Sequence, residues 1–207
     1  MFRNSQKENY LDTLYKSEPD HIKKIRESCP ENLKKMQMNY SECRLLSFFL
    51  KSIKANKVLE LGTLVGCSAA WIAESISGEE PLVITVEKSI KNYEIAKKNL
   101  SADKRIKLVH ADALEFLESC NETFDAIFID AKKIEYKSYL KAAKGLLREG
   151  GMLIADNTFM VDYEAIPEIS QAVHEFNVLI ESDKDLTSVI IPTASGLTIV
   201  IKNSSTE

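Results

Sequence analysis

Two glycines four residues apart interrupt an apolar stretch and give the first indication of a ligand site. They are Gly62 and Gly66 in KVLELGTLVGCSAAWIA, residues 57–73, which predicts a strand, a tight turn and a helix in that order. A dinucleotide site would show G-x-G-x-x-G at such a turn, and a phosphate-binding P-loop would place a lysine after the second glycine. Here Cys67 and Ser68 follow Gly66. The turn therefore favours a nucleoside that lacks phosphates.

Two acidic residues in the segments that follow describe this ligand further. Glu87 closes the apolar run LVITVE, where a carboxylate can accept hydrogen bonds from both hydroxyls of a ribose. Asp112 opens a helical segment in HADAL, where an adenine amino group could be bound. Each residue also has an ordinary structural interpretation, Glu87 as a solvated strand end and Asp112 as a helix N-cap. Together with the glycine turn they predict S-adenosylmethionine, an adenosine with a sulfonium in place of a pyrophosphate.

Segments typical of strands alternate with segments typical of helices from residue 57 onward. The predicted strands are 57–61, 82–87, 105–110, 124–130, 151–156, 186–192 and 196–202, and the predicted helices begin at Gly66 or span 89–100, 112–120, 134–147 and 163–180, the last with a break near Pro167. This alternation predicts an α/β fold, a doubly wound, Rossmann-like sheet that is mostly parallel with helices on both faces. Only TASG separates the last two strands, so they are expected to form a C-terminal antiparallel hairpin.

The composition is that of a globular protein. The chain has 207 residues, of which 44% are hydrophobic and 28% charged, and its net charge of −4 gives no electrostatic footprint for nucleic acid or an anionic membrane. Its four cysteines are widely spaced without a C-x-x-C pair, which indicates reduced thiols and no zinc site. The sequence shows no apolar run long enough to span a bilayer. These features predict a cytoplasmic protein.

The first forty residues are more charged than the rest and only loosely amphipathic. We expect residues 1–40 to form a helical extension that packs on a main domain of residues 41–207. The main domain opens with a predicted helix over residues 41–53. The apolar side of this helix is predicted to carry Leu45, Leu46, Phe48, Phe49 and Ile53.

Six stretches between residues 36 and 202 resemble one enzyme family in their order and spacing. They are MQMNYSECRLLSFFL, VLELGTLVGCSAAWIA, ADAL, FDAIFIDAKKIEYKSYL, LLREGGMLIADN and EFN. They resemble the metal-dependent class I O-methyltransferases, the family of caffeoyl-CoA and catechol O-methyltransferases and their small bacterial relatives. The resemblance implies methyl transfer from S-adenosylmethionine to a hydroxyl of a catechol-like or other small phenolic acceptor, by a homodimer. The residues it implies for cofactor binding are Met38, Glu60, Gly62, Ser68, Glu87, Asp112, Ala113 and Asp130.

The same resemblance implies a metal site and a catalytic lysine. Its metal ligands would be Asp130, Asp156 and Asn157, and its catalytic residues Lys133 and Asp130. Asp130 and the Asp156–Asn157 pair follow the carboxyl ends of two predicted strands, the edge at which open α/β sheets bind ligands. Three oxygen donors favour a hard cation, Mg²⁺ foremost, with Mn²⁺ or Ca²⁺ as alternatives. Taken singly, Asp130 could be a helix cap, the pair a turn, and Lys133 a solvated lysine.

A divalent cation and a lysine together could ionise a phenolic acceptor and take up its proton. A phenol is only about one part in a thousand ionised at pH 7, and a bound divalent ion can lower the pKa of an oxygen that it binds by several units. A nearby cation would also favour the neutral amine of Lys133, which could then accept the proton.

Three features depart from the family pattern and bear on the acceptor. Lys132 stands where many relatives carry an acid, Ser195 stands where an aspartate is frequent, and segment 158–167 is shorter than usual and lacks the customary glycine. A tRNA nucleoside or a protein side chain therefore stays open as the acceptor. The glycine spacing disfavours a dinucleotide oxidoreductase, and the retained metal ligands and lysine disfavour a non-catalytic cofactor-binding module.

Overall fold

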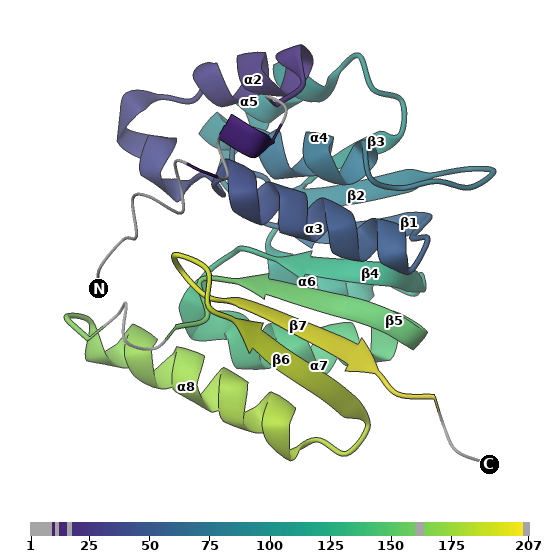
Figure 1. The fold of residues 1–207 in the computed structure, drawn as a ribbon, viewed down its shortest axis with the longest axis vertical. Helices are drawn as coiled ribbons and strands as arrows, with labels where there is room; N and C mark the ends of the chain where they lie inside the picture. The colour runs from purple at the N-terminus through teal and green to yellow at the C-terminus, as the bar shows by residue number, and fades with distance from the viewer. Residues whose placement is uncertain (1–9, 11–12, 16–17, 160–163, 205–207) are drawn as a thin grey trace.

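A seven-stranded sheet forms the centre of the molecule (Figure 1). The computed structural model describes residues 10, 13–15, 18–159 and 164–204. The strands are β1 Lys57–Leu61, β2 Leu82–Glu87, β3 Ile106–His110, β4 Phe124–Ile129, β5 Leu147–Asp156, β6 Leu186–Ile191 and β7 Leu197–Lys202, in the spatial order β3-β2-β1-β4-β5-β7-β6. Strands β1 to β5 pair in parallel, whereas β7 runs antiparallel to both β5 and β6. The predicted α/β fold with a C-terminal hairpin is confirmed.

Helices pack on both faces of the sheet. One face carries α2 Asp20–Glu27, α3 Tyr40–Ser52, α4 Cys67–Ala73 and α5 Ile90–Leu100, and the other carries α6 Ala113–Ser119, α7 Tyr136–Leu146 and α8 Pro167–Ser182. Side chains of β1 alternate between the two layers: Val58 belongs to the core under α2–α5, while Leu59 and Leu61 belong to the core under α6–α8. Because both faces are covered, the central strands are apolar at nearly every position.

The described part of the N-terminal region is helical and packs on helix α4 of the main domain. Helix α2 contacts α4 and buries Ile22 and Ile25, and a 3₁₀ turn, η1 Glu31–Met36, leads on to α3. Most of residues 1–17 lie outside the described residues. The division into an extension of residues 1–40 and a domain of residues 41–207 stays a prediction.

The apolar side predicted for helix α3 is wrong in part. The side chains that α3 buries are Glu42, Cys43, Leu46, Ser47 and Leu50. Phe48 is 65% exposed instead. The buried positions recur every three or four residues, so they follow one stripe of the helix, and Phe48 lies off that stripe. Counting apolar residues alone misplaced the stripe because two buried members, Glu42 and Ser47, are polar.

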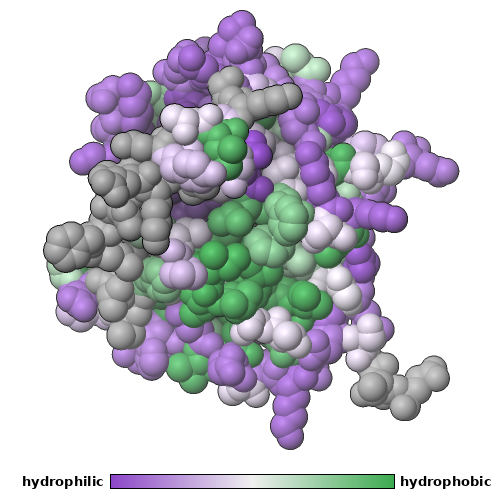
Figure 2. All heavy atoms as spheres, viewed as in Figure 1, coloured by the Kyte–Doolittle hydropathy of each residue, from purple (hydrophilic) through white to green (hydrophobic). Residues whose placement is uncertain are grey.

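An apolar area lies on the molecular face between α3 and the β6–β7 hairpin (Figure 2). Val189 pairs with Ile199, which packs in the core under α2–α5, and Ile201 lies two residues further along β7 on the same side. Val189 is 56% and Ile201 40% exposed, and Phe48 of α3 is still more exposed. This half of the sheet therefore presents large apolar side chains to its surroundings.

Several element boundaries differ from the prediction by a few residues. Strand β5 begins at Leu147, four residues earlier than expected, and takes over the end of the predicted helix 134–147. Helix α8 begins at Pro167, where the sequence indicated a break and where proline suits the first helical turn. Residues 160–163 of the short segment 158–167 lie outside the described residues. Among the described helices, no helix has both the length and the apolar character needed to cross a membrane.

Candidate active site

One cavity of about 630 Å³ opens at the carboxyl ends of β1, β2, β3 and β4. The predicted site residues that line it are Met38, Gly62, Ser68, Glu87, Asp112, Ala113, Asp130, Lys133 and Asn157. Two predicted site residues, Glu60 and Asp156, are buried next to it without forming its wall. The structure thus brings residues from positions 38 to 157 of the chain to one place.

The glycine turn lies against the end of strand β4. Gly62 has a φ of +99°, and a Cβ atom at this residue would lie 2.1 Å from the carbonyl oxygen of Asp130. Gly66 has a φ of +96° and precedes the first residue of α4. Both glycines therefore occupy left-handed backbone conformations that side chains disfavour, and Gly62 in addition permits close approach to Asp130.

The carboxylate of Glu87 is held by two backbone amides. The N–H of Leu64 donates to Oε2 at 2.8 Å, and the N–H of Ser89 donates to Oε1 at 2.7 Å. Glu87 is mostly buried and lies at the cavity wall, so the interpretation as a solvated strand end does not fit. Each oxygen keeps a second acceptor direction for a ligand hydroxyl.

Asp112 combines both interpretations drawn from the sequence. Its Oδ1 caps helix α6 by accepting from the N–H groups of Leu114 and Glu115, at 2.8 and 3.4 Å. Its Oδ2 accepts from Nζ of Lys88 at 2.7 Å, and this bond keeps the pKa of the carboxyl below its usual value. Because Asp112 also lines the cavity, the helix cap fixes an acidic group at the ligand site.

Glu60 is completely buried below the glycine turn. Its Oε2 accepts a short hydrogen bond from the hydroxyl of Thr85, whereas Oε1 has no hydrogen-bond partner among the described residues. Burial raises the pKa of Glu60 to about 7, against the opposing effect of the Ser68 and Thr85 hydroxyls. An unpartnered buried carboxylate oxygen is costly, and protonation of the carboxyl lowers this cost.

Lys133 joins the metal-site candidate to a buried tyrosine. Its Nζ donates to Oδ1 of Asp130 and to the hydroxyl of Tyr136, both at 2.7 Å. The Tyr136 hydroxyl donates in turn to the carbonyl oxygen of Asp156 at 2.9 Å. Lys133 is therefore no solvated surface lysine, and Tyr136 is a positioning residue that the sequence interpretation missed.

Asp156 is the last residue of β5 and Asn157 follows it, beside the end of β4 that precedes Asp130. Asp156 is 2% exposed, and Oδ1 accepts from the N–H of Asn157 at 2.7 Å and from the hydroxyl of Ser195 at 3.1 Å. The same hydroxyl lies 3.0 Å from Oε1 of buried Glu42. Burial, with the nearby charges of Asp130 and Glu42, raises the pKa of Asp156 above its usual value. Asn157 has a left-handed φ of +57°, which asparagine tolerates better than most residues.

The metal-site candidate has an excess of negative charge. Within the described network, the amine of Lys133 bonds to Asp130, and the hydroxyl of Ser195 links the carboxylates of Asp156 and Glu42. In the part of the chain that the structure describes, no three His, Cys, Asp or Glu side chains form a ready-made metal cage, since the candidate set contains two carboxylates and one amide. Glu42 was missed because its link to Ser195 spans 153 residues of sequence.

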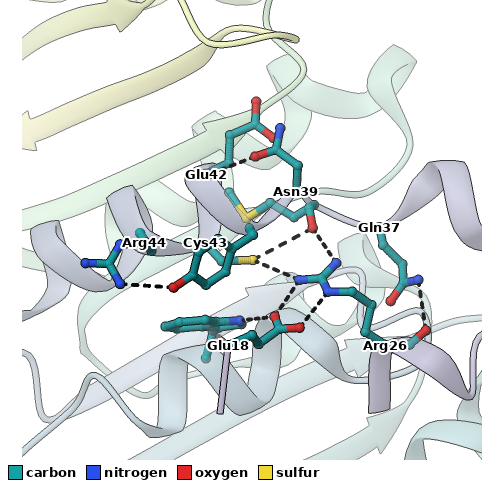
Figure 3. Close-up of polar contacts among 10 residues, drawn as sticks. Glu18, Arg26, Gln37, Asn39, Glu42, Cys43 and Arg44 are labelled. Atoms are coloured by element: carbon teal, nitrogen blue, oxygen red, sulfur yellow. Dashed lines mark hydrogen bonds and ion pairs between the residues drawn. The ribbon is translucent and has the colours of Figure 1, made fainter. Parts of the chain in front are cut away.

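A cluster around Arg26 holds the cavity wall formed by residues 35–38 (Figure 3). The guanidinium pairs with both carboxylate oxygens of Glu18 at 2.8 and 2.9 Å and donates to the carbonyl oxygen of Met38 at 2.8 Å. Nε1 of Trp71, from helix α4, donates to Glu18 at 2.8 Å. No sequence motif indicated this cluster.

Comparison with known proteins identifies the family. A family model described as O-methyltransferase matches residues 13–203. The chain belongs to this O-methyltransferase family. It is 29% identical to a caffeoyl-CoA O-methyltransferase from Populus kitakamiensis over 92% of this chain and 89% of the relative, and 32% identical to a catechol O-methyltransferase from Mycobacterium tuberculosis over 72% and 69%.

Solved structures of other O-methyltransferases have the same fold as this chain. The O-methyltransferase TomG from Streptomyces achromogenes, solved in complex with S-adenosylmethionine, superposes with a TM-score of 0.89 at 22% identity and covers 99% of this chain and 100% of its own. An O-methyltransferase from Bacillus cereus in complex with S-adenosylhomocysteine gives a TM-score of 0.85 at 24% identity, covering 94% and 96%. The predicted enzyme class is confirmed: the chain is an S-adenosylmethionine-dependent O-methyltransferase.

Proposed function

We propose that this methyltransferase transfers the methyl group to a hydroxyl of a small catechol-like acceptor and depends on a divalent cation to do so. The observation that carries this proposal is that Asp130, Lys133 and Asn157 line one cavity, while the hydroxyl of Tyr136 links Lys133 to Asp156 beside it. The relatives named as catechol and caffeoyl-CoA O-methyltransferases support the acceptor class. The net charge of −4 gives no support to a tRNA acceptor.

Other residues of the cavity wall suit the cofactor. Glu87 offers two carboxylate oxygens for ribose hydroxyls, and we assign Asp112 and Ala113 to the adenine and Met38 to the wall of the same site. The unpartnered Oε1 of Glu60 suits the ammonium group of the methionine moiety. When bound, S-adenosylmethionine supplies an electrophilic methyl group.

The metal-site candidate fits a hard divalent cation by its donor chemistry. Asp130 and Asp156 provide carboxylate oxygens and Asn157 an amide oxygen, the ligand atoms that hard divalent cations prefer. When bound, the cation supplies acidification of an acceptor hydroxyl. Mg²⁺ is the first choice for three oxygen donors, with Mn²⁺ and Ca²⁺ as alternatives.

Lys133 is proposed to accept the proton from the acceptor hydroxyl at Nζ. Its bond to Asp130 and its bond to Tyr136 fix this nitrogen at the cavity wall. These two bonds use two of the three hydrogen-bond directions of the amine, and Lys133 lines the cavity. The remaining contribution of the protein is to orient the acceptor oxygen toward the methyl group and exclude water.

Two substitutions separate these roles. Asp130→Ala should abolish Mg²⁺-dependent transfer to a catechol while leaving S-adenosylhomocysteine binding largely intact, because the variant retains Glu60, Glu87 and Asp112. Lys133→Ala should retain Mg²⁺ binding but lower turnover by about 10² to 10⁴ fold, with partial recovery at higher pH. Labelled-methyl transfer to catechols, bulk RNA and cell protein, with calorimetry for both ligands, measures each effect. Methylation of RNA or protein but of no catechol would contradict the proposed acceptor.

We also propose that the enzyme is a homodimer whose interface includes the apolar face between α3 and the β6–β7 hairpin. Val189 and Ile201 are large apolar side chains exposed on the β6–β7 hairpin, and Phe48 is exposed on α3. Such patches on soluble proteins mark interaction sites, and β6 is the edge strand of the sheet. A second copy of the same face would cover these side chains symmetrically.

A further inference from the structure

Arg26 connects two walls of the cofactor cavity that are distant in sequence. Its Nε and Nη2 atoms form a two-pronged ion pair with the carboxylate of Glu18, and Nη1 donates to the carbonyl oxygen of Met38 (Figure 3). Nη2 also lies 3.7 Å from Sγ of buried Cys43 in helix α3. A single guanidinium therefore contacts the region before α2, the cavity wall and α3.

One side of this connection is the wall itself. Met38 and Gln37 both line the cavity. Met38 is tied to the guanidinium through its carbonyl oxygen, and Gln37 donates from Nε2 to the carbonyl oxygen of Arg26 at 3.3 Å. Arg26 thus holds the wall at two successive residues, once by its side chain and once by its backbone.

The other side of the connection is helix α4. Nε1 of Trp71 in α4 donates to Oε1 of Glu18, which also accepts from Nη2 of Arg26. Helix α4 starts at Cys67, and both Cys67 and Ser68 line the same cavity as Met38. The chain from Met38 through Arg26 and Glu18 to Trp71 therefore spans from one wall to the helix that forms another.

We propose that Arg26 is a positioning residue for cofactor binding, which sets the distance between the wall at residues 37–38 and helix α4 without touching the cofactor. The pair with Glu18 is largely buried, with exposed side-chain fractions of 24% for Arg26 and 10% for Glu18. Hydrogen bonds from Arg26 and Trp71 hold the pKa of the Glu18 carboxyl below its usual value although burial alone would raise it. Lysine cannot replace the guanidinium, because one ammonium cannot make the planar two-pronged pair and reach Met38 as well.

The chain contains a matched control for this role. Arg105 also forms a two-pronged pair, with Asp103 at 2.7 and 2.9 Å, and also donates to a backbone carbonyl, that of Ala73 at the end of α4. None of these three residues lines the cavity. Arg105→Met therefore removes a comparable set of contacts on the same helix without releasing a cavity wall.

The test is calorimetric binding of S-adenosylhomocysteine to the full-length protein carrying Arg26→Met or Arg105→Met. We expect Arg26→Met to raise the Kd about tenfold or more. It should also raise the KM for S-adenosylmethionine with a much smaller change in kcat, because the substitution releases the cavity wall but leaves the reacting atoms untouched. Arg105→Met should leave the Kd within about twofold of the parent value while lowering the melting temperature.

A second variant covers the case in which Arg26→Met leaves Glu18 buried without its partner and unfolds the protein. The double substitution Arg26→Met with Glu18→Met removes both charges, so no lone buried charge remains, and it should show the same weakened binding. Unchanged Kd in a folded Arg26 variant would overturn the positioning role. The inference rests on the cavity as the cofactor site, and that premise fails separately if the unsubstituted protein does not bind S-adenosylhomocysteine.

Discussion

Replacing Gly62 with alanine tests the close approach between the glycine turn and strand β4. The new Cβ would lie 2.1 Å from the carbonyl oxygen and 2.8 Å from the carbonyl carbon of Asp130, below the 3.0 Å that Cβ atoms essentially never cross. The left-handed φ of +99° costs an alanine roughly 1–2 kcal/mol. Moving one backbone segment by roughly 1 Å to relieve the contact adds about 1–3 kcal/mol. We therefore expect a loss of about 2–5 kcal/mol in unfolding free energy.

Substitutions at two other glycines separate the backbone cost from the cost of the contact with Asp130. Gly150 has a φ of +66°, and a Cβ there would meet only Nη1 of Arg148 at 3.4 Å, so Gly150→Ala carries the backbone cost without the clash. Gly145 lies in α7 with nothing within 4 Å of a Cβ, and Gly145→Ala should stabilise the helix by about 0.5–1 kcal/mol. Urea unfolding of the three variants gives the free energies, and calorimetry should show weaker S-adenosylhomocysteine binding for Gly62→Ala alone. Equal losses at residues 62 and 150 would refute the predicted contact with Asp130.

Three further predictions follow from the buried polar groups and the apolar face. The pKa of Glu60 is about 7 in the folded protein and 4.5 for an ordinary glutamate, so the cofactor-free folded state keeps a proton that the unfolded state loses. The free energy of unfolding should therefore fall as pH rises from about 4.5 to about 7. Thermal melts of Glu60→Gln should show a flatter dependence of stability on pH. Tyr136→Phe should cost about 1–3 kcal/mol in chemical denaturation and reduce kcat more than KM, because Lys133 loses a partner and a buried carbonyl loses a donor. Phe48→Glu should convert a dimer of 23.3 kDa chains to monomers in light scattering, and a wild-type monomer at micromolar concentration would contradict the proposed assembly.

The sheet could be predicted from the sequence because its signals are local. Strands buried on both faces give short continuous apolar runs, and the five-residue connection before β7 leaves no room for a crossover. Gly62 and Gly66 fixed the place of the turn for the same reason, since left-handed conformations favour glycine. The side chains at the ends of β4 and β5 were then expected to meet, because parallel strands end at one edge.

The parts that escaped prediction depend on contacts distant in sequence. Glu42 looks like a surface residue of an amphipathic helix until the β6–β7 turn brings Ser195 against it. Arg26 is one charge among many in the N-terminal region, and its role follows only from its contact with the carbonyl of Met38. Phe48 shows the reverse error, since an apolar residue was placed in the core although the helix turns it outward.

Methyl transfer to a catechol before and after removal of divalent ions tests the central claim most directly. The protein is stripped with excess EDTA, ion removal is verified by elemental analysis, and labelled S-adenosylmethionine is added with and without restored Mg²⁺. We predict that transfer is lost in EDTA and returns with Mg²⁺, while S-adenosylhomocysteine binding persists throughout, because EDTA leaves the lining residues Gly62, Glu87 and Asp112 in place. Full transfer by the verified metal-free protein would contradict the proposed metal site, and Asp130 and Asp156 would then have structural roles only.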